Sequence, residues 1–247
     1  MSETTASTRP LRDRALDLLK WLAMLSMVLD HWRYVGWSAD WLYVPGRLAF
    51  AWFCLAIAVN VRRSTAHAER AGVNWKYLTW LGAFSVIAEL PYRLYMAGEV
   101  TTLNVMPTLV LGLLVAQGVT GRSWSVRALG IVALGLGVAF APHWMFGPFG
   151  VLLPAAFLLV LRGSLWLAVV PGLVCLLSNE WSRIIDGMLW GDPISIGALV
   201  GCLLGPWLGL ALLRWHPAFG VWPMRRWAYL IYPLHFLVLY ALRSQIL

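Results

Sequence analysis

Long apolar segments separated by short polar ones run through the chain after a small, polar stretch of nine residues. A helix needs about 20 apolar residues to cross a hydrocarbon core of about 30 Å, so these segments predict membrane-spanning helices. The breaks between them predict nine spans, at residues 15–36, 47–61, 76–97, 102–119, 125–141, 148–161, 164–178, 194–213 and 227–243. The expected fold class is therefore all-α: a polytopic membrane bundle, with residues 1–14 as a cytoplasmic tail and residues 15–247 as a single transmembrane domain.

Composition and charge agree with a membrane protein and exclude a separate soluble domain. The 247 residues are 60% hydrophobic and 12% charged, and the mean hydropathy is +0.72. The net charge of +8 comes from basic residues in short loops, where they set orientation, so no nucleic-acid partner is expected. With the N-terminus in the cytoplasm, fourteen of the 19 Lys and Arg residues lie on the inner side, and the ninth span leaves the C-terminus outside.

The cysteines do not indicate a disulfide framework or a metal site. Cys54, Cys175 and Cys202 each lie inside an apolar segment, with no CxxC motif and no Cys/His ligand spacing. Buried free cysteines of this kind are usually small core residues, and we expect no bound metal.

Glycines recur every fourth residue in the predicted span 194–213. They are Gly197, Gly201, Gly205 and Gly209. This spacing places them on one face of a helix, where the absence of side chains lets a neighbouring backbone approach closely. The pattern predicts a packing surface.

Ionisable residues inside or at the ends of the predicted spans indicate a functional site. A charge at membrane depth costs several kcal/mol unless it is paired or faces a wet cavity. In the expected topology, several polar side chains from distant segments reach the outer half of the membrane: Asp30, His31, Arg47, Glu89, Arg93, Asn104 and His235. We therefore predict that all of them except Asn104, which opens the fourth span, line one cavity.

Simpler explanations remain open for some of these residues. Glu89 and Arg93 have the i, i+4 spacing of an intrahelical ion pair. Arg47 can extend its charge to the interface, and His235 can be a core histidine. Asp30 and His31 are harder to explain structurally, because adjacent helical side chains project about 100° apart and must meet different partners.

The same segments resemble the TraX family of conjugative pilin acetylases. Residues 15–33 read ALDLLKWLAMLSMVLDHWR and residues 46–58 read GRLAFAWFCLAIA, similar to an LKxLAxxxMxxDH helix and a GRxAFPxF helix. ELPYRL (89–94), LNVMPTLVLG (103–112), the segment 149–161 and YLIYPLHFLVLYAL (229–242) resemble later parts of the family in the same order. The resemblance covers about residues 15–245; Ala51 stands where the family usually has Pro, a change that affects no ionisable group.

The resemblance implies an acyltransferase of the bacterial inner membrane that acetylates the N-terminus of a pilin subunit, with acetyl-CoA as donor. His31 or His235 would then be the general base, and Asp30 would orient a histidine or guanidinium group. The substrate or the oxyanion of the reaction would be bound by the remaining polar groups: Arg47, Glu89, Arg93 and Asn104. Arg225 and Arg226 would bind the donor phosphates.

Two other classes of function remain open at this stage. One is an integral-membrane acyltransferase whose acceptor is a lipid or a glycan. The other is a transporter or a non-catalytic pilus-assembly factor. The odd number of predicted helices and the lack of an internal repeat disfavour the paired inverted halves of many transporters.

Overall fold

The computed structural model describes residues 13–36, 39–67, 72–96, 100–215 and 217–246. Within these ranges it contains helices and no strands, as expected for an all-α protein. The α-helices are α1 (Arg14–Trp32), α2 (Tyr43–His67), α3 (Trp75–Met96), α4 (Val105–Thr120), α5 (Trp124–Ala139), α6 (Gly147–Arg162), α7 (Val169–Ser178), α8 (Trp181–Leu189), α9 (Pro193–Arg214) and α10 (Ile231–Ile246). Of the predicted cytoplasmic tail 1–14, residues 1–12 lie outside the described part.

Each of the nine predicted segments contains a helix, but the expectation of nine membrane crossings is not confirmed. Among the described helices, only Asp40–Ala66 and Pro193–Arg214 are both long and apolar enough to span a membrane. A third span exists if Leu165–Ser178 and Trp181–Leu189, bent by 92° at their junction, form one broken crossing. Helices α4, α5 and α6 have 16 residues each and therefore extend about 24 Å, less than a hydrocarbon core of about 30 Å.

Helix α8 was not predicted. It has nine residues, and its apolar positions have the i, i+3, i+4, i+7 spacing of a short amphipathic helix (Trp181, Ile184, Ile185 and Met188), not the continuous apolar run of a membrane span. In the structure α8 packs on α9, Ile184 is buried, and Trp181 and Trp190 are exposed. The apolar helices as a whole fit a membrane protein.

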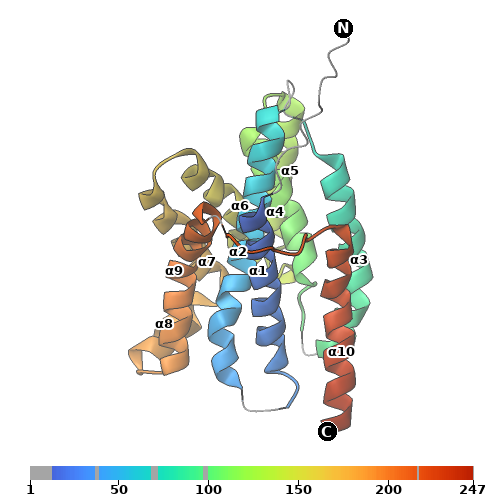
Figure 1. Ribbon diagram of the computed structural model, residues 1–247, viewed down its shortest axis with the longest axis vertical. Helices are drawn as coiled ribbons and strands as arrows, with labels where there is room; N and C mark the ends of the chain where they lie inside the picture. The colour runs from blue at the N-terminus through green and yellow to red at the C-terminus, as the bar shows by residue number, and fades with distance from the viewer. Residues whose placement is uncertain (1–12, 37–38, 68–71, 97–99, 216, 247) are drawn as a thin grey trace.

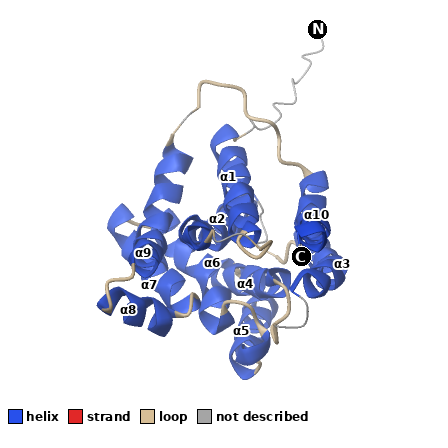
Figure 2. Ribbon diagram, turned by 90° about the horizontal axis from the view of Figure 1, so that it is seen from below, coloured by secondary structure: helices blue, strands red, loops and turns tan. Residues whose placement is uncertain are grey.

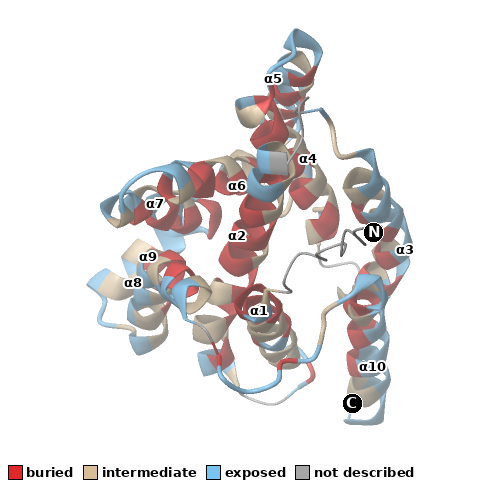
Figure 3. Ribbon diagram, turned by 45° about the horizontal axis from the view of Figure 1, so that its top comes forward, coloured by how far each residue is buried: buried red, intermediate tan, exposed pale blue. Residues whose placement is uncertain are grey.

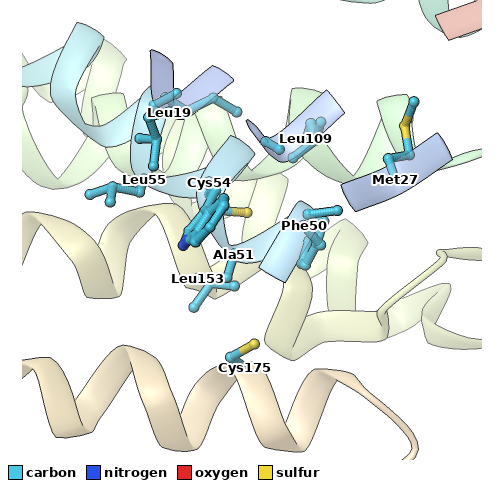
Figure 4. Packing of buried hydrophobic residues seen from close by; sticks show 14 of the residues in the cluster. Leu19, Met27, Phe50, Ala51, Cys54, Leu55, Leu109, Leu153 and Cys175 are labelled. Atoms are coloured by element: carbon cyan, nitrogen blue, oxygen red, sulfur yellow. The ribbon is translucent and has the colours of Figure 1, made fainter. Parts of the chain in front are cut away.

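Helix α2 is the centre of the bundle. It packs against α1, α4, α6 and α9, and it lies between them in Figure 2. Figure 4 shows Ala51, Cys54 and Leu55 of α2 close to Leu19 of α1 and Leu153 of α6. Helices α3 and α10 pack on each other, on the side of α1 that faces away from α9 (Figure 1). Figure 3 shows that the buried residues are concentrated on the inner helices.

The helices alternate in direction, which brings distant segments to one end. In Figure 1 the end of α1, the start of α2 and the C-terminal end of α10 lie at the bottom, and the end of α2 lies at the top. At that upper end Arg63 pairs with Asp13, which caps α1 by accepting a hydrogen bond from Leu16 N. Partial burial raises the pKa of Asp13, but the Leu16 and Arg63 hydrogen bonds outweigh burial and leave this pKa below its usual value.

The predicted glycine face of α9 is confirmed as a packing surface against α2. A Cβ atom on Gly201 would lie 3.3 Å from Val44 O and 3.4 Å from the Cβ of Arg47. Trp52 Nε1 donates a hydrogen bond of 2.8 Å to the carbonyl of Gly205. The glycines therefore let α9 approach the helix that carries Arg47.

Helices α4 and α5 cross even more closely, at Gly118 and Gly130. A Cβ on Gly130 would lie 2.8 Å from the Cα of Gly118, whereas a Cβ on Gly135 of the same helix would meet nothing within 4 Å. We predict that Gly130→Ala lowers the free energy of unfolding by about 1–3 kcal/mol, because a backbone atom cannot move aside as a side chain can. Gly135→Ala is the matched control and should raise stability by up to about 1 kcal/mol, the helix-propensity gain of alanine. Unfolding in detergent measures both, and equal effects would contradict the crossing.

Candidate active site

A cavity of about 870 Å³ lies between α1, α2 and α4 on one side and α3, α10 and the turn before α10 on the other. Its wall is mainly apolar and includes Met24, Met27, Phe50, Phe53 and Leu109. The residues of α1 in the wall extend from Lys20 to His31, which are eleven positions apart, or about 16 Å along the helix. The cavity is therefore an elongated passage along α1.

The two ends of this passage differ in chemistry. At the Lys20 end the wall contains basic and amide groups: Lys20, Asn60, Asn74, Arg225 and Arg226. At the other end it contains Asp30, His31 and the ring of Tyr232. The hydroxyl of Tyr232 accepts a hydrogen bond of 3.3 Å from Val105 N, so its own proton remains available.

Asp30 is held between two guanidinium groups. Its Oδ2 accepts a hydrogen bond of 3.1 Å from Arg47 Nη2, and its Oδ1 lies 3.1 Å from Arg33 Nε. The second contact is an ion pair without hydrogen-bond geometry, since both of its atoms are buried with no hydrogen-bond partner. Of the two roles foreseen for Asp30, the structure favours orientation of a guanidinium group over orientation of a histidine.

Arg47 is buried and fixed on every side. Its Nε donates to Tyr43 O at 3.1 Å, its Nη1 donates to Asn179 Oδ1, and its Cζ lies 3.9 Å from the ring centre of Tyr43. Arg47 thus links α1 and α2 to the turn after α7. Its snorkelling to the interface is not observed, because the side chain points into the bundle and pairs there.

A close approach of α1 and α2 brings Asp30 and Arg47 together. A Cβ atom on Gly46 would lie 2.5 Å from the Cγ of Asp30, so only glycine fits at this position. The expected start of this helix at residue 47 is corrected to Tyr43. A proline in the first turn of a helix removes no helical hydrogen bond, so α2 continues through Gly46 and Pro45 and begins before them.

His31 and His235 meet across the interface between α1 and α10. His31 Nδ1 lies 2.8 Å from His235 Nε2, and His235 Nδ1 lies 3.2 Å from Ile231 O. The ring centres are 5.0 Å apart and the ring planes differ by 15°, so the two rings lie edge to edge and nearly coplanar, as a hydrogen bond between ring nitrogens requires. His31 lines the cavity, whereas His235 lies behind it.

Of the six ionisable residues expected to line one cavity, Asp30 and His31 do so, whereas Arg47, His235, Glu89 and Arg93 are not part of its wall. Glu89 and Arg93 form the intrahelical pair anticipated as the simpler explanation, with Glu89 Oε1 accepting from Arg93 Nε at 2.7 Å. Neither residue lines the passage, because both side chains point toward the N-terminus of α4. They form a second polar group that joins α3 to α4.

Asn104 belongs to this second group and is not placed to bind an oxyanion. Its Nδ2 donates to Ser85 O at 2.8 Å and to Glu89 Oε2 at 2.7 Å, which occupies both amide hydrogens. Its Oδ1 caps α4 by accepting from Met106 N. The role expected of Asn104 is therefore corrected to helix capping and anchoring of Glu89.

Arg33, Tyr232 and Lys20 were not among the residues expected in the site, and three further contributors were also missed. Asn179 holds Arg47, Gly46 admits Asp30, and Tyr95 Oη donates to the carbonyl of His31 at 2.5 Å. Asn179 carried a recognisable signal, since it is a polar residue directly after an apolar segment. Nothing in the sequence pairs Tyr95 with His31, which lies 64 positions away.

The chain matches a known protein family. The model of a family described as TraX protein matches residues 15–243, nearly the whole chain and all of the site residues described above. No curated protein and no solved structure matches the chain.

The buried ion pair between Asp30 and Arg47 makes a testable contribution to stability. We predict that Arg47→Gln lowers the free energy of unfolding by about 3 kcal/mol, because it removes one of the two cations that compensate a buried carboxylate. Adding Asp30→Asn should recover on the order of 1–3 kcal/mol, since the uncompensated charge is then absent. Denaturation in detergent measures this double-mutant cycle.

The matched control for this cycle is the exposed pair of Arg183 and Glu180, whose side chains are 85% and 69% accessible. Arg183→Gln should change stability by no more than about 0.5 kcal/mol. Additive effects of the two site substitutions would show that Asp30 and Arg47 do not act as a pair.

Proposed function

We propose that this chain, which belongs to the TraX family, is an integral-membrane acyltransferase that moves an acetyl group from acetyl-CoA to the N-terminal amine of a conjugative pilin subunit. The observation that supports this best is the passage along α1, with basic groups at one end and a histidine at the other. An anionic donor with a long neutral arm needs a site of this shape.

The dimensions and chemistry of the passage suit this donor. Lys20, Arg225 and Arg226 receive the phosphates, since Arg binds phosphate through two parallel hydrogen bonds and Lys acts as a point charge. A pantetheine arm is on the order of 15–20 Å long, comparable to the 16 Å or so of helix between Lys20 and His31. The thioester then lies beside His31, and the apolar wall excludes water from it.

The reaction requires a base and a donor of a hydrogen bond. A pilin α-amino group has a pKa of about 7.7–8.0, so a modest base is sufficient. The neutral amine attacks the thioester carbonyl and passes its proton to His31. When the C–S bond breaks, the CoA thiolate leaves and takes this proton from His31, which restores the base.

Tyr232 is the best-placed group to stabilise the oxyanion of the tetrahedral intermediate. Its ring lines the cavity beside His235, with ring centres 5.5 Å apart, and its hydroxyl proton is not used by Val105. Among the residues first considered, Arg93 lies outside the passage and Arg47 is committed to Asp30, Tyr43 and Asn179. One such hydrogen bond is worth on the order of 3–4 kcal/mol in a transition state.

The end with Arg225 and Arg226 belongs in the cytoplasm, where acetyl-CoA is made, and His31 lies in the outer half of the bacterial inner membrane. In the expected topology, most Lys and Arg residues lie on the same side of the membrane as the N-terminus, and this excess supports the orientation. The acetyl group then crosses the inner half of the bilayer while bound to its donor. A pilin N-terminus reaches His31 from the outer side.

Label transfer from acetyl-CoA tests the proposal and separates the roles of the two ends. We predict that His31→Gln lowers the rate of acetyl transfer by about 10²–10⁴-fold and leaves donor affinity unchanged, because it removes the base. Arg225→Gln with Arg226→Gln should weaken donor binding by about 10-fold or more, the value of one charge-assisted hydrogen bond. Purified protein, radiolabelled acetyl-CoA and a pilin peptide are used for both measurements.

The matched control replaces Arg162 and Arg214 with Gln; both residues lie on the same predicted side but do not line the cavity. This variant should bind the donor normally. Label recovered on lipid or glycan instead of the peptide would assign another acceptor. Uptake of a solute into proteoliposomes without any transfer would contradict an enzyme.

Orientation is tested with reporter fusions. A reporter after Arg122, between α4 and α5, should be active in the cytoplasm, and reporters after Gly191, between α8 and α9, and after residue 247 should be active outside. A periplasmic reporter that is active after Arg122 would reverse the topology and remove the cytoplasmic route of the donor.

A further inference from the structure

His235 is buried beside the passage, where it contacts Nδ1 of His31. Its Nε2 lies 2.8 Å from His31 Nδ1, and its Nδ1 lies 3.2 Å from the carbonyl oxygen of Ile231, one turn earlier in α10. His235 is not part of the wall of the passage, unlike His31. A direct contact between His235 and a substrate in the passage is therefore not expected.

The hydrogen bonds determine which nitrogens carry protons. A carbonyl oxygen only accepts, so His235 Nδ1 donates to Ile231 and, in the neutral ring, His235 Nε2 is an acceptor. His31 Nδ1 must then donate to His235 Nε2. The remaining nitrogen of His31, Nε2, has a free lone pair.

We propose that His235 is a positioning residue that holds His31 in the Nδ1–H form and so directs a basic Nε2 into the passage. In water a neutral histidine prefers the opposite form, with the proton on Nε2, in which the cavity-facing nitrogen is no base. The catalytic consequence rests on the acyl transfer proposed above, whereas the assignment of the proton does not.

The surroundings of the two rings fix their orientation. The centre of the Phe236 ring lies 4.9 Å from the centre of the His31 ring and 4.0 Å from the centre of the His235 ring. Tyr95 Oη holds the backbone carbonyl of His31, and the ring of Tyr232 lies 5.5 Å from that of His235. Packing on several sides prevents the imidazole of His31 from turning away from His235.

This arrangement replaces the carboxylate that usually orients a catalytic histidine. Asp30 is the adjacent residue, but its carboxylate pairs with Arg47 and Arg33. A neutral histidine, anchored by a backbone carbonyl, takes that place. When His31 accepts the amine proton, its Nδ1–H bond to His235 becomes charge-assisted and stronger.

Nitrogen-15 NMR of histidine-labelled full-length protein in detergent, at pH 8, tests the proton assignment directly. The signals of His31, identified by their loss in His31→Gln, should report a protonated Nδ1 and a bare Nε2. His235→Phe keeps an apolar ring but removes the acceptor, so His31 should change to the Nε2–H form. His235→Gln is the matched variant, because its amide oxygen can accept from His31 Nδ1 and should preserve the native form.

Enzyme kinetics give the second readout. In His235→Phe we expect kcat to fall by about 10²-fold or more, as for other histidine bases in the wrong tautomer, with donor KM unchanged and partial rescue in His235→Gln. A bare Nδ1 on His31 in the native protein, or no change in His235→Phe, would overturn the proposal. Native tautomers as predicted, without acetyl transfer, would contradict the proposed function and leave the role of His235 intact.

Discussion

The ion pair between Asp30 and Arg47 is the interaction around which the site is organised. A carboxylate inside an apolar bundle is tolerated only with a compensating cation, and Arg47 supplies one from the neighbouring helix. The geometry requires two close backbone approaches: Gly46 lets α2 reach Asp30, and Gly201 lets α9 reach the stem of Arg47. Asn179 then connects the guanidinium to the turn between α7 and α8. One buried pair thus fixes the relative positions of α1, α2, α7 and α9.

With Asp30 committed to this network, the neighbouring His31 is free to face the passage. Adjacent residues on a helix project about 100° apart, so Asp30 can pair with Arg47 of the neighbouring helix while His31 lines the cavity. The polar group formed by Glu89, Arg93 and Asn104 stabilises a different part of the bundle. It fixes α3 to the start of α4, the element whose first backbone N–H binds Tyr232.

Helix α10 completes the site from the far end of the chain. It packs against α3 and carries Tyr232 and His235 on the side that meets α1. The turn that precedes it supplies Arg225 and Arg226 to the opposite end of the passage. A single C-terminal segment therefore contributes to both ends of the cavity, which places the basic groups and the histidine in one continuous space.

The sequence by itself determined the helical fold, the nine apolar segments, the packing face of α9 and the presence of two adjacent polar residues, Asp30 and His31, inside an apolar helix. These features depend on local periodicity, on glycine spacing and on the cost of charge in an apolar segment, all of which can be seen in one stretch of chain. Helix α8 and the start of α2 escaped prediction because the predicted helices followed long apolar segments, whereas α8 is short and amphipathic and α2 begins before Pro45.

Only the tertiary structure decided which residues each polar side chain of the site contacts. Whether Glu89 and Asn104 face the cavity or each other, and whether Asp30 or His235 orients His31, depends on the rotation of each helix about its axis and on contacts between residues as many as 204 positions apart. Neither the rotation of a helix nor a contact between distant residues can be read from one stretch of sequence, because both result from the packing of all the helices together.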